Sequence, residues 1–147
     1  MIWYKPYKIE DLQLMQKNTI SQHLGIEYIE IGESSISASM PVDKRTHQPF
    51  GICHGGAYVV LGEELGSMAS FMVVNPEHFI GVGVEINANH LKAVRTGLVK
   101  GICTPIHIKG KTHVLDIKLY DDEGDLCSIC RFTCQIVPRK TIELKNA

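Results

Sequence analysis

The stretch from residue 56 to residue 74 constrains the fold most, because it is the only long helical segment and it is apolar almost all round. Its apolar positions are Tyr58, Val59, Val60, Leu61, Leu65, Met68, Phe71, Met72 and Val73. A helix that is apolar on every side is buried on every side. Gly62 and Gly66 cost helix stability, which suggests that another backbone approaches closely there. The rest of the chain must therefore wrap around this helix.

Six other segments have the composition or the alternation of β-strands. In residues 81–90, alternation places one set of side chains inward, namely Val82, Val84, Ile86 and Ala88. No repeated strand–helix–strand pattern is present, so the sheet is expected to be antiparallel. The predicted fold class is α+β, a curved antiparallel sheet around one long central helix. Strands are expected at 26–31, 35–42, 81–90, 98–108, 112–120 and 126–137.

The two ends of the chain are expected to be less central to the fold. Residues 8–23 have an apolar stripe that predicts one short amphipathic helix, ended by Gly25. We therefore describe residues 1–24 as an N-terminal helical segment. The charged residues 138–147 are expected to form a loose tail. With no linker or internal repeat, residues 1–147 are expected to be a single domain.

Composition excludes several classes of partner. Apolar residues make up 44% of the chain and charged residues 21%, which is typical of a globular protein. A formal net charge of −1 gives no basic surface for nucleic acid. Charges interrupt every apolar run before it reaches the length of a signal peptide or of a membrane helix, roughly 18 residues. We therefore expect a cytoplasmic protein with no membrane partner.

The cysteines and histidines do not suggest a metal site. Cys127, Cys130 and Cys134 lie in a strand-like segment, where residues three apart point to opposite faces, so they are interpreted as core-filling thiols. The chain has seven histidines, but none forms a pair with metal-ligand spacing on the expected helix. His107 and His113 flank a turn without a matching acidic ligand. We expect no metal and no cofactor.

The start of the long helix offers a place for an anion. Its first amides have no partner within the helix, and the helix dipole is positive at this end. Gly55 and Gly56 allow a ligand to approach that backbone closely. The amide of Gly55 is therefore a candidate oxyanion hole, although an ordinary glycine turn before a helix has the same sequence.

Two carboxylates lie in the middle of the same apolar helix. Burying Glu63 or Glu64 without a partner is costly, so one of them is either held by a hydrogen bond or is functional. Ser67 lies four residues after Glu63 on the same helical face, where it either orients the Glu63 carboxylate or bonds back to the helix backbone.

The spacing of these groups requires a second subunit. Gly55 and Glu63 are eight residues apart, which separates them by about 12 Å along one helix. They reach one carbonyl group together only if two copies of the helix lie antiparallel across a two-fold axis. If the site is real, the protein is at least a dimer, with two equivalent sites.

The segment from Gln48 to Ser67, with Gly83-Val-Glu-Ile-Asn-Ala-Asn-His90, resembles the hotdog-fold acyl-CoA thioesterases. It is most similar to the branch of the 4-hydroxybenzoyl-CoA and 1,4-dihydroxy-2-naphthoyl-CoA thioesterases. The resemblance implies that Glu63 is the catalytic carboxylate, as nucleophile or general base, and that the Gly55 amide of the partner subunit is the oxyanion hole. It implies a homodimer, often paired into a homotetramer.

The resemblance also implies roles for further residues. Gln48 and His54 position the thioester, and Ser67 orients water or substrate near the carboxylate. Met68 either lines the acyl pocket or packs in the core. The residues expected to bind CoA are Gly83, His90, Leu91, Lys92, His107, Lys109, Lys111 and Thr112. Among these, the lysines are candidates for meeting phosphates as point charges.

Several functions remain open on the same fold. A dehydratase would use a histidine base, for which His54 is the candidate, and a non-catalytic acyl-CoA sensor would not keep the carboxylate. The expected substrate is an aryl-CoA such as hydroxynaphthoyl- or hydroxybenzoyl-CoA. A proofreading role on thioesters of an acyl or aryl carrier protein is the alternative.

Overall fold

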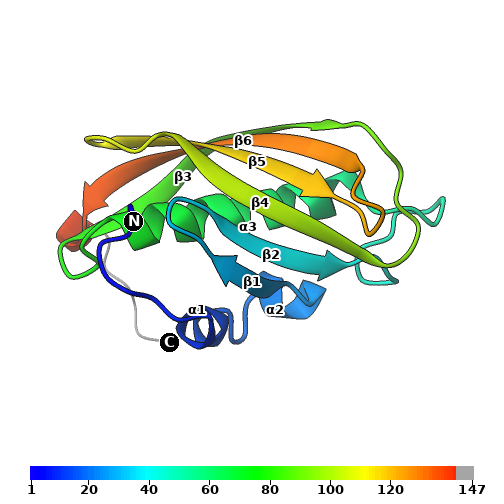
Figure 1. Cartoon of the computed structure of the whole chain (residues 1–147), viewed down its shortest axis with the longest axis horizontal. Coiled ribbons are helices and arrows are strands. Elements are labelled where there is room, and N and C mark those ends of the chain that lie inside the picture. Colours follow the sequence, from blue (N-terminus) through cyan, green and yellow to red (C-terminus); the bar gives the residue numbers. More distant parts are fainter. Residues whose placement is uncertain (142–147) are drawn as a thin grey trace.

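One helix lies along the concave face of a curved sheet, as the sequence predicts. The computed structural model describes residues 1–141, and Figure 1 shows the sheet wrapped around α3. The six strands have the order β1-β2-β4-β5-β6-β3, and every pairing is antiparallel. The elements are α1 (Ile9–Met15), α2 (Ile20–Leu24), β1 (Glu27–Ile31), β2 (Ile36–Pro41), α3 (Gly55–Val73), β3 (Phe79–His90), β4 (Leu98–His107), β5 (Thr112–Tyr120), β6 (Leu126–Pro138) and a 3-10 turn (Arg139–Thr141).

The core lies between α3 and the sheet, and it explains the two glycines of the helix. A Cβ atom on Gly62 would lie 3.0 Å from the sulfur of Cys130, and one on Gly66 would overlap the ring of Phe132. Both neighbours belong to β6 of the same chain. The expectation that these glycines allow another backbone to approach is therefore wrong. They make room for large β6 side chains, which lets the sheet pack closely on α3.

The edge strand β3 contains a bulge that the alternating sequence does not reveal. Gly83 pairs with Cys134 and Glu85 pairs with Thr133, so Val84 is an extra residue on this strand. Val84 is 60% exposed. The predicted inward set is right for Ile86 and Ala88, which pack against the core, and wrong for Val82 and Val84, which do not. A bulge shifts the side-chain alternation by one residue, which places Gly83 against the helix instead.

A second irregularity affects the cysteines of β6. Leu119 pairs with Ser128 while Tyr120 pairs with Leu126, so Cys127 is the extra residue. Because of this bulge, Cys127 lies near Tyr58 of α3, and Cys130 contacts the same helix further along. The prediction that these two side chains diverge is therefore wrong. All five cysteines are buried and unpaired, as expected for core-filling thiols.

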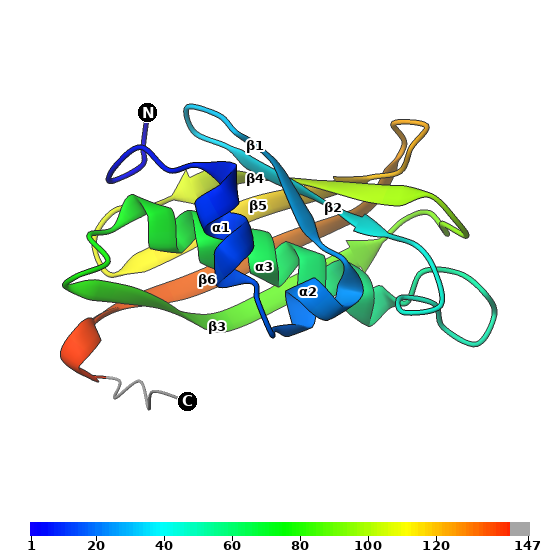
Figure 2. The same cartoon turned by 90° about the horizontal axis from the view of Figure 1, so that it is seen from below.

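The N-terminal segment forms two short helices rather than one. The chain leaves the helical conformation after Met15 and reaches a left-handed conformation at Asn18, with φ 61°. It resumes as α2 at Ile20 and ends, as predicted, at the left-handed Gly25. Figure 2, seen from below, shows α1 and α2 in front of α3, with α1 in contact with β1 and α2 in contact with α3. The break turns Ile20 out of the predicted apolar stripe, and its side chain is 60% exposed.

The predicted tail begins later than expected. Pro138 is the last residue of β6 and pairs with Phe79. Arg139 then bonds back through its amide to the carbonyl of His78 and through its guanidinium to that of Pro76. Residues 142–147 of the expected tail lie outside the described part. Among the helices described, none has the length and apolar character needed to cross a bilayer.

His113 on β5 predicts a specific pH dependence of stability. Its side chain is buried, and its Nδ1 has no hydrogen-bond partner within residues 1–141. Burial, with a smaller contribution from His107, lowers the pKa of His113 below its usual 6.5. The unfolded chain therefore binds this proton at a higher pH than the folded protein does. The stabilising contribution is complete above pH 6.5 and is lost as the pH falls towards the folded pKa.

We expect His113→Leu to reduce this acid sensitivity. The measurement is the free energy of unfolding by urea from pH 8 to pH 5. The difference between wild type and variant should shift in favour of the variant below pH 6.5. His23→Gln, at an exposed histidine of α2, is the control and should leave the pH dependence as in wild type. Parallel curves for wild type and His113→Leu would show that His113 does not cause the acid loss.

Candidate active site

The two adjacent glutamates of α3 lie in different surroundings. Glu64 accepts three hydrogen bonds, from Gln16 Nε2 at 2.9 Å, Ser21 Oγ at 2.6 Å and the Tyr28 hydroxyl at 2.6 Å. All three donor residues are buried. Burial and, next, the Glu64 carboxylate raise the pKa of Tyr28, which keeps its hydroxyl a donor. Glu64 is therefore a structural carboxylate that fastens the N-terminal helices to α3.

Glu63 is exposed, and no donor contacts its carboxylate within the described chain. It lies in a pocket of about 200 Å³ with Ser67 one turn further along α3. The bulge of β3 brings Gly83 against it, since a Cβ atom at that position would lie 2.9 Å from Glu63 Oε1. The structure thus brings together three predicted site residues, Glu63, Ser67 and Gly83. A carboxylate without a partner, beside apolar walls, is available to react with a ligand.

The N-terminus of α3 is held in place by His54. The His54 Nδ1 atom accepts a hydrogen bond of 2.8 Å from the Gly56 amide and so caps the helix. A neutral His54 in this arrangement carries its proton on Nε2 and presents a donor there. No acceptor within residues 1–141 meets the amide of Gly55. Two donors, the Gly55 amide and His54 Nε2, are therefore free at this end of the helix.

Gln48 and His90 border a second pocket, of about 290 Å³, at this helix end. Its lining residues are Gln48, Ile52, Cys53, Gly55, Tyr58, His90, Leu91, Lys92 and Ala93. The Gln48 Oε1 atom accepts from the amide of Phe50, which leaves the Gln48 Nε2 group to donate. The ring of His90 lies against Gly55 and stacks on Tyr58, with 5.3 Å between ring centroids.

A buried serine orients His90. Ser128 Oγ lies 3.0 Å from His90 Nδ1 and 3.2 Å from the carbonyl oxygen of Asn89. Because the serine hydroxyl donates to that carbonyl, His90 Nδ1 donates to the serine oxygen. His90 Nε2 is then an acceptor on the side of Gly55. Sequence reasoning did not include Tyr58 or Ser128, since nothing in a strand or helix pattern links them to His90.

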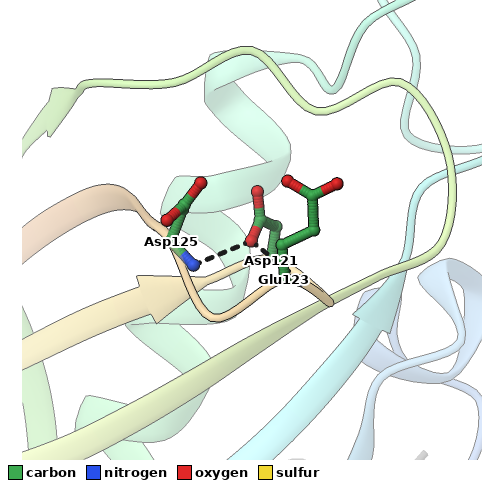
Figure 3. A group of neighbouring side chains, drawn as sticks. All are labelled: Asp121, Glu123 and Asp125. Carbon is green, nitrogen blue, oxygen red and sulfur yellow. Dashed lines mark hydrogen bonds between the residues drawn. The ribbon is translucent and has the colours of Figure 1, made fainter.

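Lys92 is not the free cation that was expected to meet a phosphate. Its ammonium lies 2.6 Å from Asp121, 2.7 Å from Asp125 and 3.1 Å from Glu123. Figure 3 shows these three carboxylates gathered at the β5–β6 turn. The hydrogen bonds that its ammonium donates to them, the one to Asp121 first, raise the pKa of Lys92. The group carries three negative charges and one positive charge, so it disfavours a phosphate in this arrangement.

Leu91 lines the same pocket as His90, whereas the predicted CoA-binding residues of the 107–112 turn lie far from His90 in one chain. Thr112 pairs with Gln135, which pairs with Val82, whereas His90 lies at the opposite end of β3. Eight residues of strand separate the two positions, about 26 Å. Lys109 and Lys111 are exposed in the β4–β5 turn, where His107 Nε2 bonds to the Lys109 carbonyl. Met68 is buried in the core and is not brought to the pocket that contains Glu63.

Within one chain the structure therefore forms two separate parts of a site. Gln48, His54, Gly55 and His90 gather at the N-terminus of α3, and Glu63, Ser67 and Gly83 gather two turns later. The distance between them along the helix is about 12 Å, as the spacing predicts. Sequence reasoning missed two residues of the Glu63 pocket, Ile20 and Ser21, because it placed them on a continuous N-terminal helix.

Comparison with known proteins agrees with this architecture. Residues 50–128 match the profile of the thioesterase superfamily. A crystal structure of a mutant thioesterase from Pseudomonas aeruginosa superposes with a TM-score of 0.93 and 46% identity, covering 94% of this chain and 99% of that one. The 1,4-dihydroxy-2-naphthoyl-CoA hydrolase of Escherichia coli is 42% identical over 137 residues, 93% of this chain and 100% of the relative.

A relative named for a different role is about as similar to this chain as the hydrolase from Escherichia coli. A proofreading thioesterase of Cronobacter turicensis is 41% identical over 137 residues, which are 93% of this chain and 99% of the relative. The profile spans α3 and strands β3 to β5, and each of the two relatives aligns with 93% of the chain. From the match over this whole framework, the chain belongs to the thioesterase superfamily and is a thioester hydrolase with the hotdog fold.

Proposed function

We propose that this enzyme hydrolyses an acyl-CoA thioester, with an aryl-CoA such as hydroxybenzoyl- or hydroxynaphthoyl-CoA as the preferred class. Glu63 of one subunit acts on a carbonyl group held at the Gly55 amide of the partner subunit. The observation that carries the proposal is the contrast between the adjacent glutamates. Glu64 is satisfied by three buried donors, whereas Glu63 is exposed in a pocket with no bonded donor in the described chain.

The proposed chemistry uses donors and a carboxylate that the chain already places. The thioester oxygen accepts hydrogen bonds from the Gly55 amide and from the Nε2 groups of Gln48 or His54, which stabilise the negative charge as it develops. If Glu63 is a general base, it takes a proton from water as the oxygen attacks the carbonyl carbon. The C–S bond then breaks, and the thiolate leaves and is protonated.

Nucleophilic attack by Glu63 is the second route and uses the same groups. Here the carboxylate forms an anhydride with the acyl group and expels the thiolate, and water then hydrolyses the anhydride. Both routes end in the free acid and CoA. Both also require a carboxylate that is not already bonded to another group, and within residues 1–141 no donor contacts the Glu63 carboxylate.

A homodimer is part of this proposal. Val59, Val60, Glu63 and Ser67 form a stripe of α3 that the chain's own sheet leaves partly open. The neighbouring β3 is an edge strand, paired only with β6 among the described strands. An open apolar stripe beside an unpaired edge favours association with a second copy. An antiparallel arrangement would bring Gly55 of one copy to Glu63 of the other, and a pair of such dimers gives the tetramer.

Other lines of the expectation stay proposals. The relative named as a proofreading thioesterase supports a carrier-protein thioester as the alternative substrate. A cytoplasmic location, one domain over residues 1–147, and CoA contacts from the 107–112 turn belong to the same proposal.

Free-thiol release from a panel of aromatic and aliphatic acyl-CoAs tests the proposed hydrolysis of acyl-CoA thioesters. Fast release from one class supports the proposal, and no release from any CoA ester contradicts it in favour of carrier-protein substrates.

Co-expression of two inactive variants tests whether the site is shared between subunits. We expect Glu63→Gln and Gln48→Ala each to be slow alone. When they pair at random, half of the dimers are mixed, and each mixed dimer has one intact site and one doubly changed site. Turnover should recover to about a quarter of the wild-type rate.

The measurement is steady-state hydrolysis by the purified mixture, with the two single variants blended without subunit exchange as the control. Activity equal to the average of the two single variants would show that each site is built within one chain. That result would contradict the shared site and leave the thioesterase reaction itself untouched.

A further inference from the structure

We infer that α2 forms a wall of the acyl pocket and that Ile20 limits the acyl group to a single ring or a short chain. The inference rests on the proposed function, because it identifies the pocket of Glu63 as the place of the acyl group. Ile20 and Ser21 line this pocket together with five residues of α3, which are Val59, Val60, Glu63, Glu64 and Ser67. No other helix or strand outside α3 contributes to the lining of this pocket.

Ile20 is not explained by core packing. Its side chain is 60% exposed, although the next apolar residue of the segment, Leu24, is buried. Exposure of one aliphatic side chain is ordinary on a protein surface. In this case, however, the side chain borders the one pocket that contains the unpaired carboxylate, opposite the valines of α3. An apolar group lying against Glu63 would therefore remove apolar surface of Ile20 from water.

The wall is fixed in position by the second glutamate. A five-residue helix is not stable by itself, so α2 depends on its tertiary contacts. Ser21, directly after Ile20, donates to Glu64 Oε2 at 2.6 Å and is 1% exposed. Thr19, directly before it, donates through its hydroxyl to the carbonyl of Gln16 at 2.6 Å. The backbone of α2 at Ile20 is thus held by hydrogen bonds of both neighbouring residues.

Within one chain the pocket measures about 200 Å³, and it is lined by the same stripe of α3 that a second copy would cover. An apolar cavity of roughly 150 Å³ in another protein holds one benzene molecule. One substituted ring therefore fits, whereas two fused rings would press against Ile20. The hydroxyl of Ser67, on the same stripe of α3 as the valines, is one polar group in the lining that a ring substituent could meet. Among the proposed aryl-CoA substrates, the structure thus favours a benzoyl-type over a naphthoyl-type group.

Two substitutions at Ile20 test the inference in opposite directions. The measurement is kcat/KM of wild type, Ile20→Ala and Ile20→Phe with acetyl-CoA, benzoyl-CoA and 2-naphthoyl-CoA. Ile20→Ala should raise the naphthoyl-to-benzoyl ratio by about 10-fold or more, the usual scale for a few carbon atoms in an apolar pocket. Ile20→Phe should lower kcat/KM for both aromatic substrates by about 10-fold and leave acetyl-CoA nearly unchanged.

A matched control distinguishes a specific effect of Ile20 on the substrate ratios from a general effect of changing the N-terminal helices. Leu14→Ala removes an aliphatic side chain that is 71% exposed on α1 and lies outside the pocket, so its substrate ratios should equal those of wild type. Ser21→Ala removes the bond to Glu64 and should weaken the discrimination in the same direction as Ile20→Ala, with circular dichroism showing that the fold is retained.

The outcomes distinguish this inference from the function on which it rests. If wild type hydrolyses acyl-CoAs but both Ile20 variants keep its substrate ratios, the inference is wrong and the proposed function stands. If wild type hydrolyses none of the three esters and no other acyl-CoA, the proposed function is wrong and the inference falls with it. A higher naphthoyl-to-benzoyl ratio in Ile20→Ala, together with a lower aromatic-to-acetyl ratio in Ile20→Phe, supports both.

Discussion

Replacing Glu63 with glutamine is expected to lower kcat by about 1,000-fold, within the range for loss of a general base. Glutamine has nearly the same shape but neither takes up the proton of water nor forms the anhydride readily. Because the carboxylate is exposed and has no bonded donor in the described chain, the melting temperature should stay close to that of wild type. KM should change little, since the lost interaction acts mainly in the transition state.

The measurement is free-thiol release from the best acyl-CoA, together with thermal unfolding of the same samples. Glu77→Gln, at an exposed glutamate after α3, is the matched control and should keep wild-type values for both. Wild-type turnover in Glu63→Gln would mean that the pocket holding Glu63 is not where the thioester is cleaved.

Removing the neighbouring carboxylate should have its main effect on stability. Glu64→Ala leaves three buried donors, those of Gln16, Ser21 and Tyr28, without their acceptor. Each buried polar group without a partner costs about 1–3 kcal/mol, so the free energy of unfolding should fall by roughly 3 kcal/mol or more. The N-terminal helices should loosen first, because Glu64 joins them to α3.

Urea unfolding followed by circular dichroism measures this loss, and Tyr28→Phe provides a smaller step in the same network. Removing one hydroxyl donor while keeping the ring should cost about 1–2 kcal/mol. At a temperature where Glu64→Ala is folded, its turnover should exceed that of Glu63→Gln. Equal stability of Glu64→Ala and wild type would show that the three hydrogen bonds do not fasten the N-terminal segment.

Together the two glutamates show how far sequence reasoning reaches. Two adjacent carboxylates in an apolar helix predict that one of them is either held by a hydrogen bond or is functional, because an unpaired buried charge is costly. The sequence alone cannot tell which, since neighbouring helix positions differ only by rotation around the axis. The choice depends on what packs against each side. In the structure, Ser21 and Tyr28, far away in the sequence, meet Glu64 and leave Glu63 open.

The strands show the same limit in another form. Alternation places most strands within a residue or two of their observed ends, and the inward positions Leu115, Ile117 and Leu119 of β5 are buried. It fails at Val84 and Cys127, where a bulge adds one residue and shifts the alternation. A bulge is decided by the register against the partner strand, which no single strand's sequence contains.

The sequence by itself determined the antiparallel sheet around one helix. The apolar surface of the helix needs a cover, and strands that follow one another without helices between them form an antiparallel sheet. It also determined that Gly55 and Glu63 cannot meet in one chain, since helix rise fixes their separation. Only the tertiary structure decided that Lys92 is neutralised by the β5–β6 turn, that Gly62 and Gly66 make room for β6, and that α2 borders the Glu63 pocket. These features depend on contacts between distant segments, and the local pattern of residues does not specify such contacts.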